Sequence, residues 1–268
     1  MAKVVEYNAK VTSRLEINPF LIVLGVTPEQ PVTFKPGQYV VLALKASTPR
    51  VSNSTPESNP KEGDAIIQRA YSIASANTSK ELEFYLALVT AGELTPRLFS
   101  LKVGDPVYVS AKPVGLFTLD RVEEKKSLLL VATGTGLAPY ISMLRSQMDV
   151  LKNKKVVVLQ GARHVGDLGY RDELEVLAKK HPNIIYMPVL SQGAKDPAWK
   201  GLNGYLQDTI FSGEVEKRAD LKVTPDNFDV FICGNPAMIK SAIEKLSAVG
   251  FVLAKGKTPG TIHIEEYW

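Results

Sequence analysis

The chain has 268 residues, of which 45% are hydrophobic and 22% charged, and its net charge is +4. This composition is that of a globular protein and excludes a disordered, collagen-like or coiled-coil chain, while the length favours two domains. No apolar run approaches the ~20 residues of a membrane-spanning helix, and the N-terminus lacks the pattern of a signal peptide. The charge is too small to indicate nucleic-acid binding, but it suits an acidic partner protein or a phosphorylated small molecule.

Cysteine and histidine usage limits the chemistry further. The single cysteine, Cys233, excludes an internal disulfide, a zinc finger and a self-contained four-cysteine iron–sulfur cluster, and it favours a cytoplasmic location. His164, His181 and His263 are far apart and lack the spacing of metal ligands. We therefore expect no metal site.

The first 120 residues read as β-structure. Short runs rich in β-branched and aromatic residues are broken by Pro and Gly. In the run 81–89, Leu82, Phe84 and Leu86 fall on one face, which is the period of a half-buried strand. Thr95-Pro96 predicts a helix start, with Thr95 as the capping residue. A small antiparallel barrel or sandwich is expected, with strands over 4–11, 20–26, 38–44, 81–89 and 107–110.

The second half alternates buried strands with helical patterns, which is typical of a doubly wound parallel sheet. The charged stretch 121–126 separates the halves, so we expect domains over 1–122 and 123–268. The polar segments 46–64 and 212–227 are expected to be loops. Strands are predicted over 127–132, 155–160, 183–189 and 228–233, and helices over 139–151, 172–180 and 236–249.

A glycine-containing turn, Thr133-Gly-Thr-Gly136, follows the first of these strands and opens a helix. Glycines allow a phosphate to approach the backbone closely, and a helix N-terminus offers unpaired N–H groups. The pattern is not the usual GxGxxG, and a tight turn without a ligand would explain it as well. The strand–helix context favours nucleotide binding.

A second turn, Cys233-Gly-Asn-Pro-Ala-Met238, lies where another strand ends. Ligands of open α/β sheets bind outside the carboxyl ends of the strands, so both turns are expected at one edge. Free cysteine is most often a buried structural thiol. Its position at a strand end nevertheless favours a role for Cys233 in a site.

The third motif, Arg69-Ala-Tyr-Ser72, lies in the β half. A guanidinium can bind a diphosphate with two hydrogen bonds, and an aromatic ring two residues later on the same strand face can stack on a flat heterocycle. Alone, the tetrapeptide is equally an ordinary polar strand. Its weight comes from the combination with the two turns.

In this order and at these separations, the three motifs resemble the ferredoxin–NADP reductase family, and most of all the bacterial flavodoxin/ferredoxin–NADP reductases. The resemblance implies an antiparallel β-barrel that binds FAD, followed by an α/β domain that binds NAD(P) and ends in an aromatic tail on the flavin. It also implies hydride transfer between NAD(P)H and FAD, and single-electron transfer with ferredoxin or flavodoxin. Further matching stretches are Phe34–Tyr39, Glu83–Leu86, Leu94–Leu98, Gly161–Arg163 and Glu266–Trp268.

The same resemblance implies roles for individual residues. Arg69 would bind the FAD pyrophosphate, Tyr71 would stack on the isoalloxazine, and Cys233 would lie beside the nicotinamide. Tyr71, Ser72, Cys233 and Tyr267 form the implied catalytic set. The remaining implied FAD residues are Ala70, Phe84, Tyr85, Leu86, Ala87, Glu93, Leu94, Thr95, Thr135 and Trp268, and the NAD(P) residues are Thr133, Gly134, Gly136, Arg163, Ser191, Gln192, Tyr205, Gly234 and Met238.

The nicotinamide nucleotide is the main departure from the family pattern. Bacterial relatives that use NADP typically carry arginines where this chain has Gln192 and Tyr205. An adenosine 2′-phosphate is best bound by a guanidinium. Arg163 remains, so NADP is kept ahead of NAD, with Arg171, Lys195 and Lys200 as candidates for compensation.

Three questions stay open. The missing arginines favour an NADH-dependent reductase of the cytochrome b5 reductase type, which serves a haem protein or an oxygenase, whereas the Tyr-Trp terminus disfavours it. The loop 46–64 is expected to be a disordered insertion, or else to shape a partner-docking face. The basic clusters are expected to be solvated surface, or else a docking surface for an acidic ferredoxin or flavodoxin; they comprise Lys152, Lys154, Lys155, Lys255 and Lys257.

Overall fold

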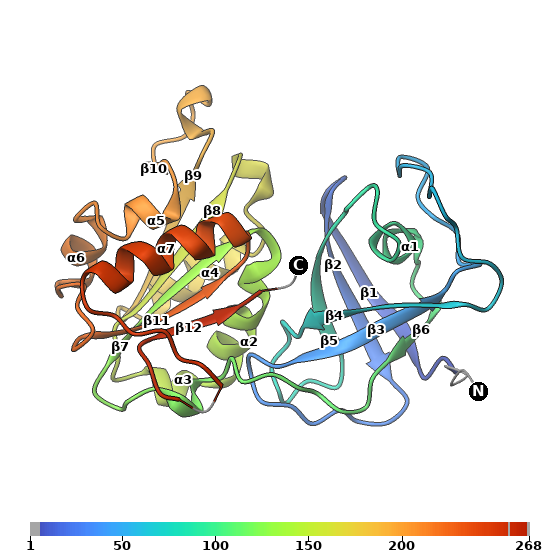
Figure 1. Cartoon of the computed structure of the whole chain (residues 1–268), viewed down its shortest axis with the longest axis horizontal. Helices are drawn as coiled ribbons and strands as arrows, with labels where there is room; N and C mark the ends of the chain where they lie inside the picture. The colour runs from blue at the N-terminus through green and yellow to red at the C-terminus, as the bar shows by residue number, and fades with distance from the viewer. Residues whose placement is uncertain (1–5, 257, 267–268) are drawn as a thin grey trace. The chain divides into compact units, whose positions relative to one another are not determined.

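The computed structural model of the chain describes residues 6–256 and 258–266. The chain divides into two compact units (Figure 1). Unit 1 comprises Met1–Leu116 with Ile141–Ser146, and unit 2 comprises Phe117–Tyr140 with Gln147–Trp268. The expected functional domains, 1–122 and 123–268, stay a prediction.

Unit 1 contains a six-stranded sheet in which every neighbouring pair is antiparallel, in the order β4-β3-β6-β1-β2-β5. The first strand extends further than the sequence indicated, to Asn18, and residues 4 and 5 of the expected run lie outside the described residues. The strands are β1 (Ala9–Asn18), β2 (Leu21–Pro28), β3 (Tyr39–Lys45), β4 (Ile66–Ser72), β5 (Leu82–Ala87) and β6 (Pro106–Val109).

The sheet of unit 1 curls so that its two outer strands approach each other. Just after β4, the Ala74 N–H donates to the Glu83 carbonyl of β5 at 2.8 Å. Apolar side chains fill the interior, which gives the N-terminal antiparallel barrel that the sequence predicts. Fully buried members of this core include Ile22, Leu24, Val40, Leu42, Leu44, Phe84 and Leu98.

The short helix α1 (Thr95–Ser100) begins at Thr95, one residue earlier than predicted. Leu94 is the N-cap residue, so the expectation that Thr95 caps the helix is wrong. The Thr95 hydroxyl instead accepts from the Val89 N–H at 3.0 Å and donates to the Val89 carbonyl at 3.2 Å. A side chain committed to the preceding strand end cannot also cap the helix.

Unit 2 contains a six-stranded sheet in the order β10-β9-β8-β7-β11-β12, with all neighbours parallel. Two outer strands, β10 and β12, were not predicted from the sequence. One has only two residues, and the other, Ile-His-Ile-Glu, lacks a continuous apolar run. The strands are β7 (Ser127–Thr133), β8 (Val156–Ala162), β9 (Ile184–Leu190), β10 (Leu202–Asn203), β11 (Phe228–Cys233) and β12 (Ile262–Glu265).

Helices cover the sheet of unit 2, with α5, α6 and α7 in front of it in Figure 1. The helix expected over 139–151 is interrupted at Gln147, whose φ of −126° and ψ of 28° are not helical. The expected loop 212–227 contains α6. The α-helices that follow the barrel in sequence are α2 (Ala138–Ser146), α3 (Met148–Leu151), α4 (Arg171–Lys180), α5 (Leu206–Thr209), α6 (Glu214–Ala219) and α7 (Pro236–Ala248), and the 3-10 helices are η1 (Leu119–Arg121), η2 (Gly134–Leu137), η3 (Val165–Asp167) and η4 (Gly193–Lys195). The part Ile141–Ser146 of α2 is assigned to unit 1.

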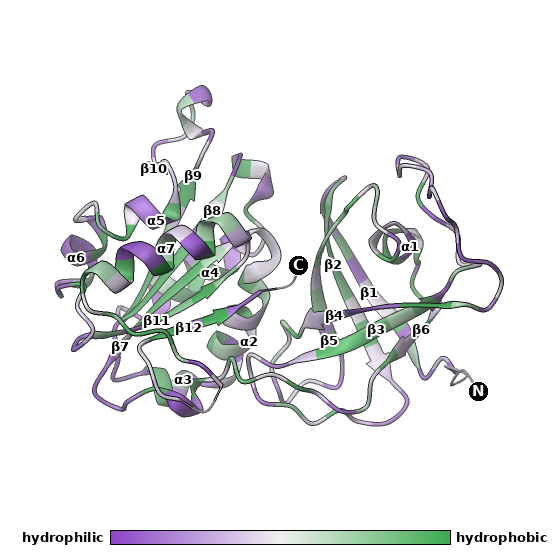
Figure 2. Cartoon of the chain, viewed as in Figure 1, coloured by the Kyte–Doolittle hydropathy of each residue, from purple (hydrophilic) through white to green (hydrophobic). Residues whose placement is uncertain are grey.

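The central strands β7 and β11 are buried along their length, because helices pack on both faces of a parallel sheet. Figure 2 shows these strands as hydrophobic, whereas the connections carry much of the hydrophilic colour. The ends of the strands are therefore where polar chemistry can lie. Within the described ranges, no helix has the length and apolar character needed to cross a bilayer.

Candidate functional site

The Arg-Ala-Tyr-Ser motif lies on β4 of unit 1, where Arg69 and Tyr71 share a face because strand side chains alternate. Tyr71 is half-buried and packs against the barrel core, and burial raises the pKa of its hydroxyl far above the ordinary value. The Arg69 side chain remains 56% exposed. Ser72, at the end of the strand, is buried. The motif thus offers a neutral aromatic ring beside an accessible guanidinium.

Glu93 lies between two cations of unit 1. Its Oε2 accepts from Arg69 at 2.9 Å, and its Oε1 accepts from Lys61 at 2.9 Å. The hydrogen bond from Lys61, with a further contribution from Arg69, lowers the pKa of the Glu93 carboxyl. The carboxylate therefore stays ionised near neutral pH and holds both cations close to the start of α1.

The strand β5 offers two different faces. Phe84 and Leu86 belong to the barrel core, so either could reach a ligand only through its backbone. Tyr85 is also buried, at 3% exposure, and Ala87 is half-buried. Leu94, just before α1, is buried as well. Because side chains alternate along a strand, Tyr85 and Ala87 lie on the face of β5 opposite to Phe84 and Leu86.

In unit 2, the two glycine-containing turns lie in direct contact. Cys233 is the β11 partner of Ala132 in β7, and the turn that follows packs on Gly136. A Cβ added at Gly136 would lie 2.5 Å from the Cys233 carbonyl oxygen. Gly136 is therefore needed for packing between the turns, and its spacing alone does not require a ligand.

Gly134 differs from Gly136. Its φ is +55°, and a Cβ added there would have nothing within 4 Å. The positive φ favours glycine, and the space above it is open. Thr133 links the turns, because its hydroxyl accepts from the Asn235 N–H at 2.8 Å. Gly134 is thus the position where a phosphate could approach the backbone.

The thiol of Cys233 is fully buried. Met238, in the first turn of α7, is 6% exposed. The Asn235 side chain caps that helix by accepting from the N–H groups of Ala237 and Met238. A contact between Cys233 and a nicotinamide stays a prediction.

Three of the expected NAD(P) residues come together beyond β8 and β9. The Ser191 N–H donates to the Ala162 carbonyl at 2.9 Å, and the Gln192 N–H donates to the Arg163 carbonyl at 3.1 Å. Arg163 is exposed. Tyr205 is 62% exposed at the start of α5, one residue beyond a backbone hydrogen bond to β9. Of these four residues, Arg163 is the charged one, and Ser191, Gln192 and Tyr205 are neutral.

Of the other cations named for the 2′-phosphate, Lys195 is exposed in η4, directly after Gln192, and its N–H donates to the Gln192 carbonyl at 3.0 Å. The other two lie elsewhere in unit 2. Arg171 and Lys200 line a cavity of about 530 Å³, together with Trp199 and Arg218. The Arg171 guanidinium lies 5.7 Å from the Trp199 ring and pairs with Glu175 at 2.7 Å. The residues that line this cavity do not include Arg163, Ser191, Gln192 or Tyr205.

Lys154 does not fit either interpretation of the basic clusters. It is 8% exposed, and its Nζ donates to the carbonyls of Glu123, Glu124 and Lys126 at 2.8, 2.5 and 2.9 Å. Burial lowers its pKa. Lys154 therefore stabilises the chain before β7 rather than presenting charge. The exposed members of the clusters are Lys152, Lys155 and Lys255.

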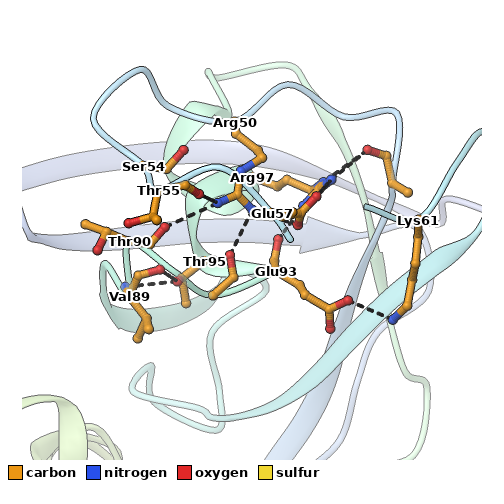
Figure 3. Close-up of polar contacts among 12 residues, drawn as sticks. Arg50, Ser54, Thr55, Glu57, Lys61, Val89, Thr90, Glu93, Thr95 and Arg97 are labelled. Atoms are coloured by element: carbon orange, nitrogen blue, oxygen red, sulfur yellow. Dashed lines mark hydrogen bonds and ion pairs between the residues drawn. The ribbon is translucent and has the colours of Figure 1, made fainter. Parts of the chain in front are cut away.

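The loop 46–64 is not the disordered insertion that its composition suggests. Arg50 and Glu57 form an ion pair at 2.7 Å, and Arg97 of α1 pairs with Glu57 at 2.6 Å (Figure 3). This role of Arg50, Glu57 and Arg97, and that of Lys61, was not predicted from the sequence. The only signal was a set of charges in a polar loop, and nothing local joins Glu57 to a helix 40 residues later.

Three residues with expected roles, Tyr267, Trp268 and Lys257, lie outside the described residues. Among the residues that the structure does describe, no three His, Cys, Asp or Glu side chains gather in a way that could hold a metal ion. The expected site residues of unit 1 and of unit 2 thus form two groups, each within its own unit.

The carboxyl ends of the strands, where the two glycine-containing turns lie, are the place where open α/β sheets bind their ligands. The family model described as an oxidoreductase NAD-binding domain matches residues 130–244. A structure of a ferredoxin NADP+ reductase from Neisseria gonorrhoeae with bound FAD and NADP superimposes with a TM-score of 0.83, over 97% of this chain and 98% of that chain, at 23% identity.

Relatives at higher identity define the family. A flavodoxin/ferredoxin–NADP reductase from Buchnera aphidicola subsp. Baizongia pistaciae is 34% identical over 78% of this chain and 83% of its own length. A ferredoxin–NADP reductase from Pseudomonas aeruginosa is 30% identical over 97% of this chain and 96% of its own length. The chain belongs to the flavodoxin/ferredoxin–NADP reductase family, as the three motifs predicted.

Proposed function

We propose that this protein is an FAD-dependent reductase that exchanges a hydride with NADP(H) and single electrons with a small acidic redox protein, ferredoxin or flavodoxin. The observation that carries the proposal is the position of Arg69 and Tyr71 on one face of β4, in a chain of this family. An accessible guanidinium next to a half-buried phenol fits the pyrophosphate and the flat ring of a flavin dinucleotide.

The residues of unit 1 fit FAD in charge and in shape. Arg69 would hold the pyrophosphate, Tyr71 would stack on the isoalloxazine, and Ser72 would hydrogen-bond near its reactive nitrogen. Tyr85 and Ala87 would contact the ring from β5 with the side chains that face away from the core. Backbone N–H groups of 93–95 would hold phosphate or ribose oxygens.

In unit 2, the turn at Gly134 would receive the pyrophosphate of the nicotinamide nucleotide, since open space lies above a backbone that no side chain covers. Thr133 and Gly234 would support that turn. Arg163, with Ser191 and Gln192 beside it, would bind the 2′-phosphate. Cys233 would border the nicotinamide, and Tyr267 and Trp268, which lie outside the described residues, would contribute to FAD binding.

Bound FAD supplies the redox chemistry, because it accepts a hydride and releases electrons one at a time. The protein's own contribution is orientation. Tyr71 would fix the plane of the ring, and Ser72 would hold a hydrogen bond at the atom that receives hydride. The deeply buried Cys233 would keep water away from the nicotinamide. Thr135 would also contribute to FAD binding.

A second candidate is an NADH-dependent reductase that serves an oxygenase or a haem protein. The observation that favours it is that Gln192 and Tyr205, in the expected 2′-phosphate region, are neutral and leave Arg163 as the guanidinium beside them. A phenol 2-monooxygenase reductase component from Pseudomonas sp. is 30% identical over 90% of this chain and 61% of its own length. The two candidates differ in the nucleotide that they prefer, NADPH or NADH, and in the protein to which they pass electrons.

The experiment is anaerobic. Purified protein is mixed with NADPH and, separately, with NADH, and the visible flavin spectrum is followed; ferredoxin or flavodoxin is then added as acceptor. Rapid bleaching by NADPH followed by reduction of the acceptor supports the first candidate. Bleaching by NADH at least as fast favours the second. A protein that retains no flavin spectrum after incubation with FAD and removal of the unbound FAD contradicts both candidates.

A further inference from the structure

The loop 46–64 of unit 1 is bound to α1 at several points. The Val51 N–H donates to the Pro96 carbonyl at 3.1 Å, and the Ser100 hydroxyl donates to the Pro49 carbonyl at 2.7 Å. The Thr55 N–H donates to the Thr90 carbonyl at 2.9 Å. The loop is therefore fixed both to the helix and to the segment 90–94 that leads into it.

Glu57 forms the centre of this attachment. Both of its oxygens accept from the Arg97 guanidinium, at 2.6 and 3.0 Å, and Arg50 donates to one of them at 2.7 Å (Figure 3). Arg97 also donates to the carbonyls of Ala46 and Glu93. The Arg97 side chain is only 3% exposed. A buried charge with this many partners holds the loop in one position.

Arg50 extends the same network to the segment 90–92, which precedes α1. Its guanidinium donates to the carbonyls of Gly92, Thr90 and Thr55 at 2.8, 3.2 and 2.7 Å. The backbone of 90–92 is thereby fixed by a side chain of the loop. The loop is thus part of the framework that shapes the approach to α1.

The far end of the loop carries Lys61 to the carboxylate that also holds Arg69. Each cation takes one oxygen of Glu93, at 2.9 Å in both pairs. The side chains of Lys61, Arg69 and Glu93 are 46%, 56% and 31% exposed, so a ligand can reach all three. A pyrophosphate diester has two negative charges, and two cations gathered on one carboxylate match them.

We propose that Lys61 binds the pyrophosphate of the flavin dinucleotide together with Arg69. When the pyrophosphate binds, it displaces the Glu93 carboxylate from these two cations. Glu57 and Arg97 are positioning residues that hold the loop so that Lys61 reaches the site. This inference rests on the proposed function, because it assumes that unit 1 binds FAD.

Within the trio of Lys61, Arg69 and Glu93, removing the charge of Lys61 and removing that of Glu93 should change FAD affinity in opposite directions. Lys61→Gln removes one of the two cations, so the Kd for FAD rises about tenfold, the value of one charge-assisted hydrogen bond. Lys61→Arg restores the charge and returns the Kd to near the wild-type value. Glu93→Gln removes the competing anion, so the Kd for FAD falls. A purely structural role for the trio would instead weaken FAD binding in both Gln variants.

The test is FAD titration of the apoprotein by fluorescence quenching. Lys45→Gln is the matched control, because Lys45 pairs with Asp64 of the same loop at 3.0 Å and belongs to no ion pair with Glu93. A raised Kd for Lys61→Gln with a lowered Kd for Glu93→Gln supports the inference. An unchanged Kd for Lys61→Gln, an equal loss in Lys45→Gln, or weaker binding by Glu93→Gln overturns it. Wild-type apoprotein that fails to bind FAD overturns the proposed function instead.

Discussion

The backbone carbonyl of Cys233 lies against Gly136, so that a Cβ at position 136 would come within 2.5 Å of the carbonyl oxygen. The two glycine-containing turns at the carboxyl edge of the parallel sheet therefore support each other through their backbones. Since neither main chain can move away without breaking parallel pairing between β7 and β11, the contact constrains substitution at Gly136.

We predict that Gly136→Ala destabilises unit 2 by about 1–3 kcal/mol, because the added methyl group overpacks the contact between the turns. Gly166→Ala is the control, since a Cβ at Gly166 meets nothing within 4 Å. Urea unfolding of both variants measures the difference. Equal stability of the two variants would mean that the turns separate easily.

Tyr71→Ala is expected to weaken FAD binding by about 1–3 kcal/mol, the contribution of stacking a heterocycle on an aromatic side chain. Tyr71→Phe keeps the ring and should bind FAD nearly as tightly as wild type. Fluorescence titration gives the affinities. Thermal unfolding of the flavin-free variants checks that removal of the half-buried side chain has not destabilised the barrel core. Wild-type affinity in Tyr71→Ala would remove the stacking role.

Nucleotide preference should respond to the two neutral positions near Arg163. Gln192→Arg places a second guanidinium beside it, and we expect the ratio of kcat/KM for NADPH over NADH to rise about tenfold or more, since a hydrogen bond to a charged group contributes about 1.5–3 kcal/mol. His181→Arg adds the same charge just before β9, at the opposite end of that strand, and should leave the ratio unchanged. A similar rise in both variants would indicate a general effect of charge.

The attachment of loop 46–64 is expected to fail in acid. Hydrogen bonds from Arg97, with Arg50 contributing, lower the pKa of the Glu57 carboxyl below its ordinary value of 4.5. A carboxyl whose pKa is lowered by folding stabilises the folded loop above that ordinary value, and the stabilisation is lost as the pH falls through the lowered pKa. Loop opening should therefore increase at pH values below 4.5.

Hydrogen exchange at the Val51 and Thr55 amides, corrected for intrinsic rates, measures this opening. Glu57→Gln should open the loop at neutral pH, with a local free energy lower by about 1.5–3 kcal/mol, and should flatten the acid dependence. Asp64→Asn, which alters an exposed pair at the end of the same loop, should keep the wild-type profile. An acid transition that persists in Glu57→Gln would show that another group controls the loop.

The order of local patterns in the sequence determined the fold class. Alternating apolar residues, as in Leu82, Phe84 and Leu86, require one buried face, and continuous apolar runs such as 127–132 require two. Glycine turns at strand ends indicated a nucleotide site in the same way. These features depend on residues near each other in the chain, so a local pattern suffices to predict them.

Only the tertiary structure decided which distant residues meet. It assigned Gly136 to packing against Cys233 and left Gly134 as the open turn, although both glycines look alike in the sequence. It also joined Glu57 to Arg97, and Lys61 to Glu93 and Arg69, across a loop that looked disordered. Composition records that such charges exist, but the free energy that orders a loop comes from partners far away in sequence, and their positions are set by the folded barrel.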